Sequence, residues 1–231
     1  MNIQGLQKLT LLDYPGQLAC TIFTAGCNFR CPFCHNAPLV THVDESCNIP
    51  MEEIFSFLKK RQGVLGGVCI SGGEPCLQPD LYEFMQEVKG LGYKIKLDTN
   101  GSFPEKLREL VEAKLVDYVA MDIKNSARKY PETIGIEAYD LSRIEESIEY
   151  LMSNVVPFEF RTTVVREFHK KDDFLDIARW IAGDEPYFLQ GFEDSGDLIC
   201  EGLHGYTKEI MDQAVNLVRE QIPNTALRGV E

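Results

Sequence analysis

Residues 18–36 of this chain read Leu-Ala-Cys-Thr-Ile-Phe-Thr-Ala-Gly-Cys-Asn-Phe-Arg-Cys-Pro-Phe-Cys-His-Asn. An apolar run typical of a buried strand, residues 18–23, leads directly into a loop with the spacing Cys-x3-Cys-x2-Cys. Cys27, Cys31 and Cys34 therefore place three thiolates on one tight loop. Structural zinc sites close with four ligands, and electron-transfer clusters take four cysteines. A [4Fe–4S] cluster held by three thiolates would keep one iron open to a small molecule.

The composition limits the classes to which this chain can belong. With 231 residues, 44% of them hydrophobic, residues 1–231 are expected to form a single domain. No apolar stretch reaches the ~18 residues of a membrane span, and the N-terminus lacks a secretory signal, so we expect a cytoplasmic protein. The formal net charge of −13 argues against nucleic-acid binding, which needs a basic surface.

Eight cysteines are many for a cytoplasmic protein of this length. Thiols stay reduced in that compartment, so metal binding or catalysis is a better interpretation than a disulfide framework. Outside the loop, the remaining cysteines are scattered, and each is expected to be either a small buried side chain or an incidental residue without a role. These are Cys20, Cys47, Cys69, Cys76 and Cys200.

Strand-like runs alternate with helical periodicity along the chain, which favours βα units around a parallel sheet. The expected strands are residues 18–23, 68–71, 94–98, 118–121, 158–165 and a last one at 187–189. The expected helices include 51–60, 81–91, 141–153, 174–181 and 210–218, and a further helix holds Leu107, Leu110 and Val111 behind a capping box of Ser102 and Glu105. Six units predict an α/β fold, a partial (β/α)6 TIM-like barrel. A doubly wound sheet is the alternative, and pattern alone does not decide between them.

Polar residues follow the first four expected strands at the edge that carries the active site in parallel α/β folds. After the cysteine loop come residues 71–75, 98–101 and 122–124. Any one of these clusters could be an ordinary turn, but four at one edge indicate a ligand site.

The second cluster, Gly72-Gly73-Glu74, is either a plain turn or a place where a ligand approaches the main chain. In the second case Glu74 is suited to pair with an ammonium group. Asp98 opens an Asn-Gly-type turn, or it accepts from a ribose hydroxyl or holds a cation.

Charged residues in the later expected strands have two possible roles each. Asp122 and Lys124 form a simple ion pair, or Lys124 binds a carboxylate and leaves Asp122 for a hydroxyl or a cation. Arg161 interrupts an apolar strand, so it makes either an internal salt bridge or a ligand contact. The isolated His42, His169 and His204 have no assigned role.

Taken together, these motifs resemble those of the radical S-adenosylmethionine (SAM) enzymes. The cysteine motif with the Gly-Gly-Glu-Pro turn carries this likeness, which extends over nearly the whole chain. Cys34-His35-Asn36, residues 97–101 and residues 121–124 are similar to those of glycyl-radical-enzyme activases, above all the activating proteins of anaerobic ribonucleoside-triphosphate reductases. Residues 160–165 fit that group too.

The resemblance implies a mechanism. Cys27, Cys31 and Cys34 would hold a [4Fe–4S] cluster whose fourth iron binds the amino and carboxylate groups of SAM. One electron from a flavodoxin or ferredoxin would cleave SAM to methionine and a 5′-deoxyadenosyl radical. That radical would take a hydrogen atom from a glycine of the partner, an anaerobic ribonucleotide reductase. The cofactor does this chemistry, so no side chain is assigned as catalytic.

The resemblance also implies roles for individual residues. Phe33 and His35 would flank the adenine, whereas Gly72, Gly73 and Glu74 would meet the amino group of SAM. Asp98 and Asp122 would act near the sugar or help to bind a monovalent cation, and Lys124 with Arg161 would meet the carboxylate.

Two departures from the family pattern concern the end of the sheet and the cysteine loop. Gln190 stands where some activases carry a histidine near the adenosyl group. Residues 42–50 stand where many activases insert two further clusters, so a single-cluster activase is expected. The alternatives are a radical SAM enzyme acting on a small molecule or another macromolecule, and a zinc-binding or electron-carrier module.

Overall fold

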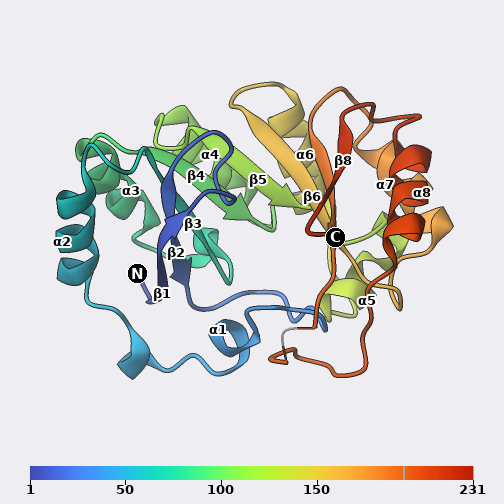
Figure 1. Ribbon diagram of the computed structural model, residues 1–231, viewed down its shortest axis with the longest axis horizontal. Coiled ribbons are helices and arrows are strands. Elements are labelled where there is room, and N and C mark those ends of the chain that lie inside the picture. Colours follow the sequence, from blue (N-terminus) through green and yellow to red (C-terminus); the bar gives the residue numbers. More distant parts are fainter. Residues whose placement is uncertain (195, 231) are drawn as a thin grey trace.

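A curved eight-stranded sheet forms the centre of the computed structural model, which describes residues 1–194 and 196–230 (Figure 1). Its strands lie side by side in chain order, and all are parallel except β1, which pairs antiparallel with β2. The strands are β1 (Ile3–Thr10), β2 (Ala19–Thr24), β3 (Gly67–Gly72), β4 (Lys94–Thr99), β5 (Tyr118–Asp122), β6 (Phe158–Val164), β7 (Tyr187–Gly191) and β8 (Thr225–Arg228). Because β1 and β8 are its two edges, the sheet is an open barrel.

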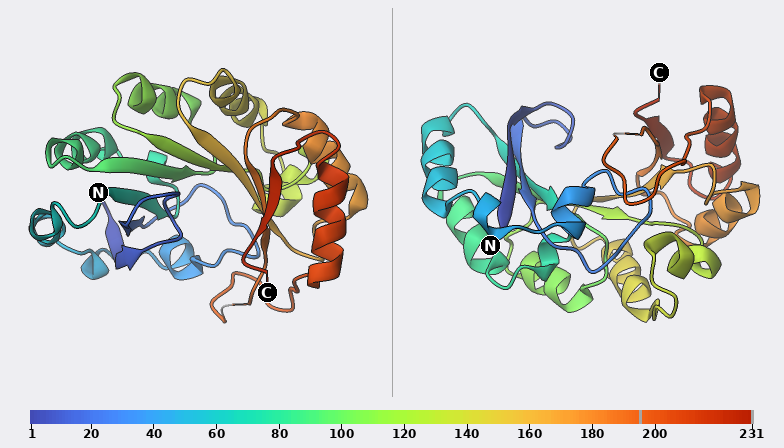
Figure 2. Two further views of the ribbon diagram at one scale, coloured as in Figure 1. Left: turned by 45° about the horizontal axis from the view of Figure 1, so that its top comes forward. Right: turned by 90° about the horizontal axis from the view of Figure 1, so that it is seen from below.

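The longer helices lie on the convex side of this sheet, as the left view of Figure 2 shows, whereas the short helix after the cysteine loop lies at its open side and contributes Val40 to a cavity there. The helices are α1 (Ala37–Thr41), α2 (Met51–Arg61), α3 (Leu81–Gly90), α4 (Pro104–Glu112), α5 (Tyr130–Ile134), α6 (Ser142–Met152), α7 (Lys171–Trp180) and α8 (Lys208–Val218). A doubly wound sheet carries helices on both faces. The long helices α2, α3, α4, α6, α7 and α8 all lie on the outer face, and the strands follow chain order, which confirms the partial barrel and rejects the doubly wound alternative.

The six predicted strands correspond to β2–β7, but two further strands were missed. β1 is an edge strand with two register irregularities and polar side chains in its middle, so it lacks clear alternation. β8 has four residues and includes Arg228. The prediction that residues 187–189 form the last strand is therefore wrong.

The predicted capping box at the start of α4 is also wrong. The helix begins at Pro104 behind Phe103, which makes no side-chain cap. The Ser102 hydroxyl instead donates to Asn100 Oδ1 at 2.5 Å. Proline suits this first helical position because its missing N–H would have had no partner in the helix.

Apolar residues fill both faces of the central strands, as expected when helices cover a parallel sheet. Val68, Cys69 and Ile70 of β3 are fully buried. Among the scattered cysteines, Cys20, Cys69 and Cys76 are buried, whereas Cys47 and Cys200 are exposed.

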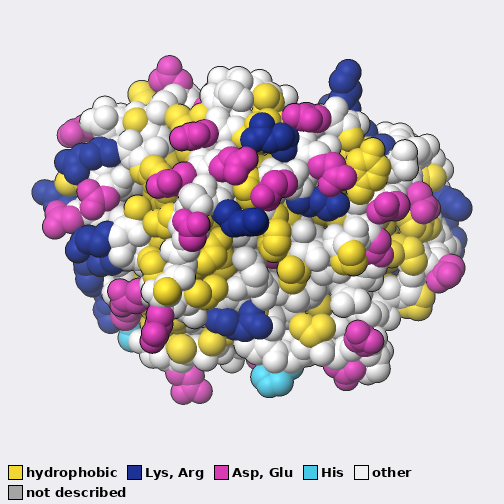
Figure 3. Space-filling view, turned by 180° about the vertical axis from the view of Figure 1, so that it is seen from behind, with side chains coloured by type: hydrophobic (Ala, Val, Ile, Leu, Met, Phe, Trp, Pro, Cys, Tyr) yellow, Lys and Arg dark blue, Asp and Glu magenta, His cyan; other side chains and the backbone are white. Residues whose placement is uncertain are grey.

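The outer surface is mixed in charge. On the face in Figure 3, acidic and basic side chains are interspersed, so the net charge of −13 is not gathered into one patch there. Within residues 1–194 and 196–230, no helix combines the length and apolar character that a membrane span requires.

Candidate active site

A cavity of about 400 Å³ opens at the carboxyl ends of the parallel strands. Every residue predicted for the site except Glu74 lines it. These are Cys27, Cys31, Phe33, Cys34, His35, Gly72, Gly73, Asp98, Asp122, Lys124, Arg161 and Gln190. Parallel strands bring their carboxyl ends to one edge, so predicted residues as distant in the sequence as Cys27 and Gln190 meet there.

The loop between β2 and α1 carries the three cysteines. Cys31 is buried, whereas Cys27 and Cys34 are partly exposed to the cavity. Burial raises the pKa of Cys27 to about 12 and that of Cys31 to about 11, so both thiols are neutral until a metal displaces their protons.

The cysteine loop fits an iron–sulfur cluster better than a single metal ion. In the described part of the chain, no three His, Cys, Asp or Glu side chains converge closely enough to hold one ion. Each thiolate of a [4Fe–4S] cube binds a different iron, so the sulfurs need not converge. Three soft thiol donors on one cavity wall match the ligand set of such a cluster.

Gly72 and Gly73 allow two chain segments to pack closely. Gly72 has φ +122°, and a Cβ there would lie 2.3 Å from the Thr24 main chain. A Cβ on Gly73 would lie 2.0 Å from the Gly26 carbonyl oxygen. The N–H of Gly73 donates to Thr24 O, and that of Glu74 donates to Gly26 O, both at 2.8 Å. These glycines therefore fix the cysteine loop against β3, in addition to lining the cavity.

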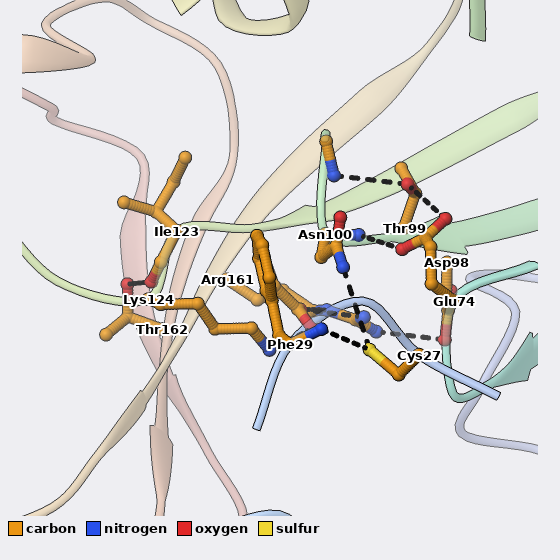
Figure 4. Close-up of polar contacts among 12 residues, drawn as sticks. Cys27, Phe29, Glu74, Asp98, Thr99, Asn100, Ile123, Lys124, Arg161 and Thr162 are labelled. Carbon is orange, nitrogen blue, oxygen red and sulfur yellow. Dashed lines mark hydrogen bonds and ion pairs between the residues drawn. The ribbon is translucent and has the colours of Figure 1, made fainter. Parts of the chain in front are cut away.

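Glu74 is the one predicted site residue that does not line the cavity. It is fully buried and accepts from the Cys76 N–H at 2.9 Å, the Thr99 hydroxyl at 2.9 Å and the Asn100 N–H at 2.7 Å (Figure 4). Burial raises its pKa, although these donors partly oppose the shift. Glu74 joins the end of β3 to the end of β4, and its contact with the amino group of SAM stays a prediction.

A chain of alternating charges covers the floor of the cavity. Lys96 pairs with Asp98, and Arg161 Nη1 lies 3.3 Å from Asp98 Oδ2. Arg161 also contacts Asp122 Oδ1 at 2.9 Å, and Lys124 Nζ lies 2.9 Å from Asp122 Oδ2. The ion pairs expected for Arg161 and Lys124 are therefore present, and they lie in the cavity rather than apart from it.

Both carboxylates of this network stay ionised. Burial raises the pKa of Asp98, but Arg161 and Lys96 outweigh it and hold that pKa below its usual range. For Asp122 burial is likewise outweighed by Arg161 and Lys124, and the pKa falls to about 2. Lys124 and Arg161 are the cations of this network that line the cavity, and each can offer N–H donors to an anionic ligand group.

The predicted aromatic residues lie on one side of the cavity. Phe33 is buried and packs against Phe168, with ring centroids 5.6 Å apart. His35 is exposed, stacks on Phe192 at 5.4 Å, and its Nε2 lies 2.8 Å from Glu193 O. The loop after β7 therefore holds His35 in place.

Several cavity residues were missed by the sequence analysis. Asp13 reaches the cavity from the turn after β1 and accepts from Thr21, a tertiary contact that no local signal predicts. Asn100 belongs to a motif that was recognised, but its side chain was given no role. The others are Phe29, Asn36, Val40, Ser71, Thr99 and Thr163.

His169 was also missed, and it supports the cavity from behind. It is fully buried, its Nε2 donates to Lys124 O at 2.9 Å, and its Nδ1 accepts from the Val165 N–H at 3.1 Å. Its ring lies 6.4 Å from that of Phe33. Burial lowers the pKa of His169, which keeps it neutral in this role.

Sequence comparisons agree with this site. Residues 21–181 match the model of the Radical SAM superfamily. A Methanocaldococcus jannaschii protein, provisionally named a glycyl-radical enzyme activating enzyme, is 36% identical over 236 residues, which cover 99% of this chain and 96% of that protein. The pyruvate formate-lyase-activating enzyme of Listeria monocytogenes is 32% identical over 134 residues, about half (53%) of each chain.

Comparisons with solved structures support the fold. SuiB of Streptococcus suis bound to S-adenosylmethionine matches with a TM-score of 0.69 at 16% identity, over 88% of this chain and 48% of that one. A domain of a pyruvate-formate lyase-activating enzyme from Bacteroides vulgatus matches with a TM-score of 0.58 at 16% identity, over 71% of this chain and 99% of that domain. At such identities the likeness establishes the architecture alone.

The family match spans most of the chain, and the cysteines, the glycine turn and the charged strand ends of the matched region meet in one cavity. The protein therefore belongs to the radical SAM superfamily, whose enzymes use a [4Fe–4S] cluster and S-adenosylmethionine, and it is a homologue of glycyl-radical enzyme activating enzymes.

Proposed function

We propose that this protein activates a glycyl radical enzyme by generating a radical on one of its glycines. The observation that carries the proposal is that one cavity brings together the three cysteines and the cationic side chains of Lys124 and Arg161. The likeness to a full-length relative named for this activity supports it. When bound, the cluster would supply one electron to SAM, and the resulting 5′-deoxyadenosyl radical would take the glycine hydrogen atom.

The charged floor would bind the amino-acid end of SAM. Lys124 and Arg161 would meet the carboxylate, because their side chains are anchored by Asp122 and both line the cavity. With Glu74 turned away, main-chain carbonyls are the remaining acceptors for the amino group. Gly72 O accepts from Asn36 Nδ2 at 3.1 Å, and a carbonyl oxygen has a second lone pair for a ligand.

The opposite side would bind the nucleoside. Phe33 and His35 offer ring faces, and Gln190 on β7 offers an amide, in a part of the cavity that Thr163 also lines. Asp98 and Asp122 can accept from ribose hydroxyls through lone pairs that their cationic partners leave over.

A monovalent cation at Asp98 and Asp122 would compete with Lys96, Lys124 and Arg161 for the same oxygens. We include it only as a state formed when SAM draws Lys124 away from Asp122. Titrating K⁺ and measuring SAM affinity tests this state. A K⁺-dependent rise in affinity supports the cation, and constant affinity rejects it.

The proposed partner is an anaerobic ribonucleoside-triphosphate reductase, with a flavodoxin or ferredoxin as the electron donor. The test incubates the anaerobically reconstituted protein with SAM, dithionite and the reductase of the same organism. We expect a glycyl radical signal by electron paramagnetic resonance (EPR), and none with Cys31→Ala. If 5′-deoxyadenosine forms but the reductase gains no radical, that partner is wrong. If pyruvate formate-lyase gains none either, a small-molecule or other macromolecular substrate becomes the better hypothesis.

A further inference from the structure

The side-chain amide of Asn100 is aimed at the sulfur of Cys27. Asn100 Nδ2 lies 3.9 Å from Cys27 Sγ, and Figure 4 shows the amide reaching across from the end of β4 to the cysteine loop. Its Oδ1 accepts from both the N–H and the hydroxyl of Ser102, at 2.9 and 2.5 Å. Because the oxygen end of the amide is fixed by these donors, its NH₂ end must face the sulfur.

The surroundings of Asn100 hold this orientation rigidly. The residue is only 6% exposed, and its backbone N–H donates to Glu74 Oε2 at 2.7 Å. Its second amide hydrogen is directed at Asn28 Oδ1, 3.0 Å away, and Asn28 Nδ2 in turn donates to Ser102 Oγ at 2.9 Å. This small network ties the cysteine loop to the end of β4.

Cys27 thereby differs from the other two cysteines of the loop. Its sulfur accepts from the Phe29 backbone N–H at 3.3 Å as well as from Asn100. Among the described residues, no side-chain N–H hydrogen bond to the sulfur of Cys31 or Cys34 is found. Two N–H donors therefore converge on a single thiolate ligand of the loop.

We propose that Asn100 is a positioning residue that raises the reduction potential of the cluster through its hydrogen bond to Cys27. One electron from an external reductant makes the cluster more negative by one charge, and N–H donors to a ligand sulfur stabilise that added charge. The inference rests on the proposed function only for the presence of the cluster, not for the partner. It gives the Asn of the Asp98–Gly101 turn a role beyond turn formation.

The experiment measures the midpoint potential of the reconstituted protein by a dithionite titration followed by EPR. Asn100→Ala removes the donor, and Asn100→Asp removes it while keeping the acceptor for Ser102 and adding a negative charge. We expect the equilibrium constant for reduction to fall about tenfold in Asn100→Ala, which is about 59 mV for one electron. The equilibrium constant for reduction should fall further in Asn100→Asp, because the added negative charge disfavours the reduced cluster.

Asn36→Ala is the matched control. The Asn36 side chain also joins the cysteine loop to a strand end, by its bond to Gly72 O, but it donates to no sulfur. The midpoint potential of Asn36→Ala should equal that of the parent protein. If both Asn100 variants, loaded with about four irons per chain, also keep the parent potential, the proposal is overturned. An equal shift in Asn36→Ala and Asn100→Ala would overturn it too, because loosening of the loop would then suffice.

A variant that fails to fold or to load its cluster must be distinguished from one with an altered potential. Circular dichroism melts and iron content identify a variant that fails to fold or load. If neither Asn100 variant loads, Ser102→Ala carries the test. It removes one of the two donors that hold Asn100 Oδ1 and so loosens the amide, which should lower the potential by a smaller amount; an unchanged potential rejects the inference. Neither SAM cleavage nor a partner enzyme enters the measurement, so a missing glycyl radical would count against the proposed function alone.

Discussion

Glu74 at the end of β3 and Asp122 at the end of β5 are both acidic strand-end residues with a predicted ligand role, yet they have different surroundings. Glu74 is fully buried among neutral N–H and O–H donors. Asp122 is 28% exposed to the cavity and pairs with Arg161 and Lys124. A carboxylate held by buried hydrogen-bond donors stabilises the fold, whereas one paired with cations at a cavity can exchange partners with a ligand.

The largest expected effect tests the structural half of this comparison. Glu74→Ala leaves the donors of Cys76, Thr99 and Asn100 without their acceptor in a dry site. Each buried donor without a partner costs ~1–3 kcal/mol, so we expect the loss of three to lower the unfolding free energy by at least about 3 kcal/mol, measured by urea denaturation. Glu74→Gln keeps one oxygen acceptor and should lose less than half of that. A change below about 1 kcal/mol in Glu74→Ala would refute the structural role.

The ligand-binding half is tested by Lys124→Met. A hydrogen bond to a charged group contributes ~1.5–3 kcal/mol, so SAM affinity should fall about 10- to 100-fold in isothermal titration calorimetry. Lys129→Met is the control, because Lys129 has similar exposure but pairs with Asp173 outside the cavity. Similar affinity losses in both variants would contradict a specific carboxylate contact.

The two carboxylates should also respond to pH with opposite signs. The pKa of Asp122 is lowered from 3.8 to about 2, so its contribution to stability is present above its unfolded value and is lost as pH falls through the folded value. Solvent screening limits this contribution to about 1–2 kcal/mol. The pKa of Glu74 is raised, so its contribution is present below 4.5 and is lost as pH rises through the folded value.

Urea denaturation of the apoprotein at a series of pH values checks these signs. Asp122→Asn should flatten the loss of stability between about pH 4 and pH 2. Glu74→Gln should gain stability relative to the parent as pH rises above the unfolded value of Glu74, 4.5. If the stability of Asp122→Asn and that of Glu74→Gln depended on pH in the same way, the surroundings of Asp122 and Glu74 would not differ as described.

The smallest effect concerns the support behind Lys124. His169→Gln keeps a donor for Lys124 O but loses the ring that packs near Phe33, so we expect a loss of about 1 kcal/mol in stability. His42→Gln, on an exposed histidine, is the control and should leave stability unchanged. If His169→Gln unfolded like Glu74→Ala, His169 would belong with the structural residues that join strand ends.

The sequence alone determined the order and type of most elements. The alternation of apolar runs with helical periodicity predicted β2–β7, because burial on both faces leaves a clear hydrophobic signal. β1 and β8 gave no such signal, because edge strands are short, irregular or partly polar. The cysteine spacing identified the loop for the same local reason, since all its ligands lie within eight residues.

Only the tertiary structure decided what each strand-end residue does. It turned Glu74 away from the cavity, brought Asp13 into it and directed Asn100 at Cys27. Residue type and spacing specify which groups are available at the edge of a parallel sheet. The partner that each group finds depends on the packing of segments that are distant in the chain, and that choice between a backbone donor, a cation and a sulfur determines its role.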